Sequence, residues 1–166
     1  MRVLWLCLPG FLYKGDLTMR VLGIDLGDKR IGVALSDEMG WTAQGLDVVK
    51  CSGRTDEDLR RIQELALQNK AEKIIVGLPR NMDGSSGARA EKAREFARRL
   101  EKSFSLPVEM WDERLTTVAA EKMLINADLR RTKRRQVIDK IAAALILQNY
   151  LDAQGGNKKD GGGVEA

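Results

Sequence analysis

The sequence predicts an α/β fold, a mixed five-stranded sheet with helices on both faces, in which three antiparallel strands precede β-α-β crossovers. Two observations support this prediction. Short segments rich in β-forming residues occupy the first third of the chain, and after residue 55 segments with helical spacing alternate with short apolar runs. An antiparallel hairpin followed by such an alternation produces a mixed sheet covered by helices.

The three antiparallel strands are expected near the start of the chain. Residues 19–25 alternate between the two faces of a strand, and residues 30–35 repeat the pattern after a turn at 27–29. The two segments therefore predict a β-hairpin. Residues 45–50 (GLDVVK) offer the third strand after a turn-like segment.

Helices and buried strands alternate in the rest of the chain. Thr55 is expected to cap a helix that runs to Asn69, with Asp58 in the capping-box position. The apolar spacing then predicts a strand at 73–77, a helix at 88–102, a strand at 107–111, a short helix to about 126 and a long helix at 135–151.

The length of 166 residues suits one domain with a proper hydrophobic core. We expect this domain at 19–152, after a dispensable extension of residues 1–18 and before a disordered Gly/Lys-rich tail at 153–166. The apolar run of the extension is broken at Pro9 and is too short to span a bilayer. The protein is therefore expected in the cytoplasm, with no membrane association.

The composition excludes several classes of active site. The chain has no histidine, which rules out Ser-His triads and His-ligated zinc. Its two cysteines, Cys7 and Cys51, lack the spacing of a disulfide framework or a metal knuckle. The net charge of +4 is compatible with a polyanionic partner.

Three carboxylates from separate segments form the candidate catalytic and metal-binding site. Asp25 ends the first strand, and Glu113 follows the strand at 107–111, so both belong to the edge where α/β proteins place their sites. Asp139 is the only acid in the helix at 135–151, where small residues at 142–144 let the helix lie close to the sheet. Such carboxylates suit Mg²⁺ or Mn²⁺, and two ions would clamp a phosphodiester.

Each carboxylate also has a simpler interpretation. Asp25 could be a turn residue, Glu113 could stabilise a helix N-terminus, and Asp139 could form a buried salt bridge with an arginine. Asp112 is an alternative to its neighbour Glu113.

Basic residues gather in the expected connector before the last helix. Like charges at this density repel one another unless a polyanion neutralises them, although a solvated loop would also explain them. Asn81, in the loop after the strand at 73–77, could contact a ligand or form a plain turn. The candidate nucleic-acid contacts are Asn81, Arg114, Arg130, Arg131, Lys133, Arg134 and Arg135.

Several motifs together resemble one known family. They are GIDLG at 23–27 with GVA at 32–34, GLP at 77–79, DERLTT at 112–117, and VID at 137–139 with AAALILQNYL at 142–151. In this order, over residues 19–152, they resemble the YqgF (RuvX) family of Holliday-junction-resolvase-like proteins. The resemblance implies a ribonuclease H-like fold and a bacterial cytoplasmic nuclease that matures the 5′ end of pre-16S ribosomal RNA. It also implies that Asp25, Glu113 and Asp139 are the family's acidic cluster.

The leading hypothesis is thus a two-metal phosphodiesterase, monomeric or homodimeric, whose partner is a ribosomal RNA precursor. Cleavage of branched DNA is the alternative, and a resolvase should be a dimer in order to cut two symmetric strands. A non-catalytic RNA-binding assembly factor is an alternative of another class. The hairpin at 23–34 also resembles the phosphate-binding hairpin of actin-like ATPases, but one domain cannot form their two-lobed cleft.

Overall fold

The computed structural model of the protein describes residues 19–79, 87–112 and 131–156, with residues 131–135 and 156 described by their backbone alone. Several expectations therefore lie outside the described residues. They concern the extension at 1–18, the short helix before 126, the tail from 157, and the side chains of Asn81, Glu113, Arg114 and Arg130.

The described strands form one mixed five-stranded sheet, as expected. The strands are β1 (Arg20–Leu26), β2 (Arg30–Ser36), β3 (Ala43–Lys50), β4 (Ala71–Leu78) and β5 (Val108–Asp112), in the spatial order β3-β2-β1-β4-β5. The pairs β1–β2 and β2–β3 are antiparallel, whereas β1–β4 and β4–β5 are parallel. The predicted order of three antiparallel strands followed by crossovers is confirmed.

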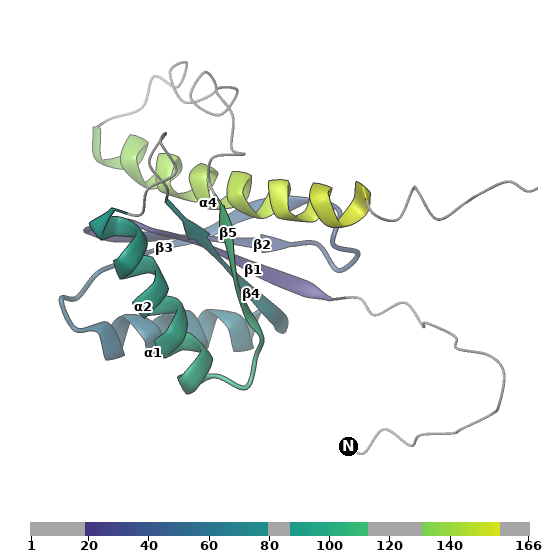
Figure 1. Ribbon diagram of the computed structural model, residues 1–166. Coiled ribbons are helices and arrows are strands. Elements are labelled where there is room, and N and C mark those ends of the chain that lie inside the picture. The colour runs from purple at the N-terminus through teal and green to yellow at the C-terminus, as the bar shows by residue number, and fades with distance from the viewer. Residues whose placement is uncertain (1–18, 80–86, 113–130, 157–166) are drawn as a thin grey trace, which may run out of the picture.

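Helices cover both faces of this sheet (Figure 1). The helices α1 (Thr55–Gln68) and α2 (Ala88–Ser103) lie on one face, and the long helix α4 (Arg131–Gly156) crosses the other. None of the helices in the described ranges combines the length and the apolar character needed to cross a bilayer.

The alternation of β1 divides the core into two layers. Leu22 and Ile24 are fully buried on the side of α1 and α2, in one cluster with Ile62 and Leu100. Val21, of the opposite parity, joins a second cluster whose other members include residues of α4. Asp25 shares the parity of Val21, so this alternation directs Asp25 to the α4 face.

A polar and aromatic cluster anchors the second half of α4 to the far strands of the sheet. Lys73 Nζ of β4 donates a hydrogen bond to the Tyr150 hydroxyl at 2.6 Å and pairs with Glu109 at 2.5 Å. The Tyr150 ring meets Trp111 of β5 edge to face, with the ring centroids 5.3 Å apart. These contacts attach α4 to β4 and β5 as well as to the hairpin.

The expected capping box at Thr55 is wrong. Arg54 occupies the N-cap position without a side-chain cap, and Thr55 is the first helical residue. Asp58 instead accepts a hydrogen bond from the backbone N–H of Ser52, at 2.9 Å. Gly53, with a φ of +81°, makes the turn between Ser52 and the helix, a conformation that favours glycine.

The last helix is longer at both ends than its apolar pattern predicts. The described helix extends back to Arg131, so all but the first residue of the basic run lie in helical turns and not in a connector. It ends at Gly156, beyond the expected domain boundary at 152. Lysine and arginine are good helix formers, and buried Leu151 keeps the C-terminal turns on the sheet.

Candidate active site

Asp25 and Asp139 approach one another because glycine occupies the position between them. Gly32 of β2 pairs with Asp25 across the hairpin. A Cβ atom on Gly32 would overlap the carbonyl oxygen of Asp139 and lie 2.9 Å from its carbonyl carbon. The backbone of α4 at Asp139 therefore rests on the sheet directly beside Asp25, so the structure brings these two of the three expected carboxylates together.

Two further glycines continue this close contact along α4. A Cβ atom on Gly23 would lie 2.8 Å from Leu147 Cβ, and one on Gly45 would lie 2.7 Å from Lys140 Cβ. Small residues of the helix contribute to the close approach as expected, since Ala143 is fully buried. The glycines of three adjacent strands are the larger cause of the close approach of α4 to the sheet. Their positions on one face of the predicted strands could have indicated this contact from the sequence.

The surroundings of Asp25 disfavour its negative charge. Burial is the main cause, and the nearby charge of Asp139 is the second; together they raise the pKa of Asp25 from 3.8 to about 6, although the charge of Arg89 opposes them. Two carboxylates that repel one another at a half-buried site form a place where a cation is electrostatically favoured.

Asp139 also forms the arginine salt bridge that its simpler interpretation predicts. Arg30 Nε lies 3.3 Å from Asp139 Oδ2, and both side chains are about a quarter exposed, at 23% and 28%. Arg30 precedes Gly32 by two residues and thus shares its face of β2. Sequence reasoning missed Arg30 and Arg89, although the parity of Arg30 with Gly32 could have indicated the first.

The third carboxylate of the expected site lies outside the described residues. Strand β5 ends at Asp112, immediately before Glu113. Trp111 packs on the α4 face, so strand alternation directs Asp112 to the opposite face and disfavours it as a substitute. Within the described ranges, no three His, Cys, Asp or Glu side chains gather as a metal site would require. The described part of the site therefore consists of Asp25 and Asp139.

The donor set of this pair fits a hard divalent cation. Carboxylate oxygens are the ligands that Mg²⁺ and Mn²⁺ prefer, and Mg²⁺ commonly binds through one or two carboxylates together with substrate phosphate. A cation between Asp25 and Asp139 would also cancel the repulsion that raises the pKa of Asp25.

Four of the expected basic contacts lie on α4 just before Asp139. At 1.5 Å per residue, Arg135 precedes Asp139 by about 6 Å along the helix axis and Arg131 by about 12 Å. The backbone of Lys133 and Arg134 lies between them. The basic turns therefore lead along one helix directly to Asp139, the member of the acidic pair that α4 carries.

Known proteins resemble this chain over most of its length. The sequence model of the RuvX family, described as "Holliday junction resolvase", matches residues 19–153. A relative from Pelotomaculum thermopropionicum, named "Putative pre-16S rRNA nuclease", is 61% identical over 145 residues, which are 87% of this chain and 94% of the relative. A relative of the same name from Bacillus subtilis is 55% identical over 136 residues, or 81% of this chain and 99% of its own.

Solved structures of low sequence identity share the fold. The RuvC protein of T. thermophilus in complex with Holliday junction substrate has a TM-score of 0.55 at 19% identity, covering 83% of this chain and 96% of its own. The yeast mitochondrial Holliday junction resolvase Ydc2 has a TM-score of 0.54 at 14% identity, and the match covers 85% of this chain and 81% of Ydc2. The chain therefore belongs to the RuvX family and has the ribonuclease H-like α/β fold of RuvC-like resolvases.

Proposed function

We propose that the protein is a metal-dependent nuclease that hydrolyses phosphodiester bonds near the 5′ end of pre-16S ribosomal RNA, in the cytoplasm. The observation that carries the proposal is the contact of the Asp139 backbone with Gly32, which holds two carboxylates from distant segments beside one another. The name of the relative that is 61% identical supports the choice of RNA.

The metal ligands in this proposal are Asp25, Asp139 and Glu113, the residue that directly follows β5. When bound, one or two Mg²⁺ or Mn²⁺ ions would activate water and stabilise the charge of the leaving oxygen. Arg30 holds the Asp139 carboxylate in place through their ion pair. This division of roles needs no histidine, and the chain has none.

The first turns of α4 would hold the phosphates of the strand to be cut. A helix N-terminus presents unpaired backbone N–H groups and a positive dipole end to anions. Arg131, Lys133, Arg134 and Arg135 add positive charge to these turns. Arg114, Arg130 and Asn81 complete the proposed nucleic-acid contacts. Because phosphate contacts dominate, binding should weaken steeply as salt increases.

Branched DNA is the second candidate substrate, and the description of the matching family supports it. The deciding experiment incubates the purified full chain with Mg²⁺ or Mn²⁺ and either a 5′-extended 16S precursor transcript or a four-way DNA junction. Faster cleavage of the transcript is expected, whereas faster, symmetric cleavage of the junction by a dimer would replace the RNA assignment.

Two variants test whether the carboxylate pair performs the reaction. Asp25→Asn and Asp139→Asn should each reduce cleavage by at least 100-fold, while Asp56→Asn, at an exposed position on α1, should leave it unchanged. An unaltered rate in Asp25→Asn would overturn the site. If the wild-type chain binds the transcript with either metal and never cuts it, the protein is an assembly factor and not a nuclease.

A further inference from the structure

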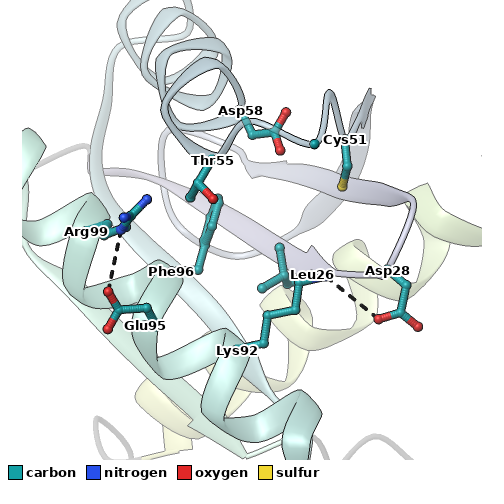
Figure 2. A pocket seen from close by; sticks show the side chains of 10 residues that line it. Leu26, Asp28, Cys51, Thr55, Asp58, Lys92, Glu95, Phe96 and Arg99 are labelled. Carbon is teal, nitrogen blue, oxygen red and sulfur yellow. Dashed lines mark ion pairs between the residues drawn. The ribbon is translucent and has the colours of Figure 1, made fainter.

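A cavity of about 420 Å³ lies on the sheet face opposite α4, between α2, the first turn of α1 and the β1–β2 hairpin (Figure 2). Its volume falls within the range of about 300 to 1,000 Å³ typical of small-ligand sites. Figure 2 shows Leu26 and Phe96 between two polar borders, with Asp58 and Cys51 on one side and Lys92 on the other. The proposed chemistry on the α4 face does not use this cavity.

The lining suits a flat, largely uncharged ring with polar edges. Leu26 and the largely buried Phe96 supply the apolar surface against which the ring would pack. Burial, together with the charge of Asp58, raises the pKa of the Cys51 thiol, so this group stays neutral near pH 7. The exposed carboxylate of Asp28 can accept hydrogen bonds from the amino groups of a heterocycle, whereas Asp58 is buried and already accepts one from Ser52.

The balance of charge argues against a phosphate inside the cavity. The lining includes two cations, Lys92 and Arg99, against the three carboxylates of Asp28, Asp58 and Glu95. A phosphate placed among these acids would be repelled, whereas a neutral ring with donor groups would not.

Cations suited to phosphates lie instead along the outer edge of the cavity, on α2. Arg89 and Lys92 are three residues apart and thus lie on the same side of this helix. Arg89 contacts Asp28 at 3.1 Å and Lys92 lies 3.8 Å from the same carboxylate. Their side chains are 76% and 50% exposed, and such surface pairs are weak enough for a phosphate to displace the carboxylate.

Arg89 also connects the cavity to the candidate active site. Its guanidinium pairs at 3.1 Å with Asp28, which lies at the entrance of the cavity and follows Asp25 by three residues in the β1–β2 hairpin. A nucleic-acid strand lying over Arg89 would therefore be close to both places.

We propose that this cavity receives one unpaired nucleobase of the substrate strand, with the adjoining backbone phosphates on Arg89 and Lys92. The inference rests on the proposed nuclease function and adds a substrate preference to it: a strand with an unstacked base near the scissile bond should bind better than a continuous duplex.

Cys51 provides a direct probe of occupancy, because Cys7 is the only other cysteine in the sequence. The experiment measures the rate of iodoacetamide alkylation of Cys51 in a Cys7→Ser chain, without divalent metal so that the strand stays intact. A single-stranded RNA of about ten nucleotides should slow alkylation at least fivefold. Protection by a DNA strand of the same sequence would show whether binding depends on the sugar. A blunt duplex of the same sequence should protect Cys51 little.

The decisive control is a strand in which abasic sites replace the bases while the phosphates remain. Equal protection by the abasic and the normal strand would overturn the inference, because phosphates alone would then explain the result. Absence of protection by any strand that binds the protein would overturn it as well.

A variant tests the same point from the protein side. Cys51→Phe should fill the cavity and weaken single-strand binding at least fivefold while duplex binding is unchanged, and Cys51→Ser should behave like the wild type. Equal losses for both nucleic acids would contradict the proposal. These outcomes are independent of cleavage. Base-dependent protection of Cys51 would support nucleobase binding in the cavity even if the protein cleaves nothing. Cleavage without base-dependent protection would support the nuclease function and overturn nucleobase binding in the cavity.

Discussion

Replacement of Asp25 by asparagine should stabilise the metal-free protein at neutral pH. The carboxyl group has a pKa of about 6 in the folded chain, against 3.8 as the ordinary value. Below pH 3.8 the group is protonated in both states and contributes nothing. Between these values the folded state retains a proton that the unfolded state has lost, so stability falls as pH rises.

The resulting loss in the free energy of unfolding is complete above about pH 6 and amounts to at most about 3 kcal/mol. Asp25→Asn removes it, so Tm should rise by up to about 6 to 12 °C at pH 8 and by little at pH 4. Added Mg²⁺ should reduce the difference in Tm between the variant and the wild type, because it stabilises the wild type more than the variant.

The assay is thermal unfolding of both proteins in chelator, from pH 4 to 8, followed by a magnesium titration at pH 8. Asp56→Asn is the matched control, since the Asp56 side chain is 95% exposed, and its effect should stay within about 0.5 kcal/mol. An Asp25→Asn effect that is the same at pH 4 and pH 8 would refute the electrostatic account of this site.

The other predictions concern the contacts that hold α4 and Asp139. Gly32→Ala should lower the free energy of unfolding in urea by about 1 to 3 kcal/mol and abolish cleavage. The control Gly155→Ala, at a position with open space around it, should raise the free energy of unfolding by up to about 1 kcal/mol. Equal effects of the two substitutions would contradict the contact of Gly32 with α4. Arg30→Gln should slow cleavage, since Asp139 loses the ion pair that holds its carboxylate, and an unchanged rate would exclude that role. Lys73→Met should lower the free energy of unfolding by about 1 to 2 kcal/mol in the same assay. The control Arg54→Met, which removes an exposed ion pair, should lower it by at most about 0.5 kcal/mol.

The sequence predicts the elements of this fold well because their periodicity is strong. The alternation of β1 and the apolar spacing of α1 and α2 are local properties, and the structure places these elements within one or two residues of the prediction. The two departures are also local: Asp58 binds Ser52 instead of completing a capping box, and α4 continues through residues with no apolar pattern.

The candidate site is less visible in the sequence because it depends on packing between distant segments. The family resemblance selects Asp25 and Asp139, but only the pairing of Gly32 with Asp25 reveals why the two approach. The ion pair of Arg30 with Asp139 joins residues 109 positions apart, so the parity of Arg30 with Gly32 indicates its face of the sheet but not its partner. Glu113 stays a prediction, since it lies outside the described residues.

The contact of α4 with Gly32 also determines which motions can alter the acidic pair. A contact between side chains adjusts through rotamer changes on the picosecond to nanosecond scale, whereas this contact joins two backbones and has no rotamers. The spacing between the backbones at Asp25 and Asp139 can therefore change only when α4 shifts as a body over β1, β2 and β3. Collective helix movements of this kind belong to the microsecond to millisecond range, so any fluctuation in this spacing should be slow and should respond to whatever binds α4.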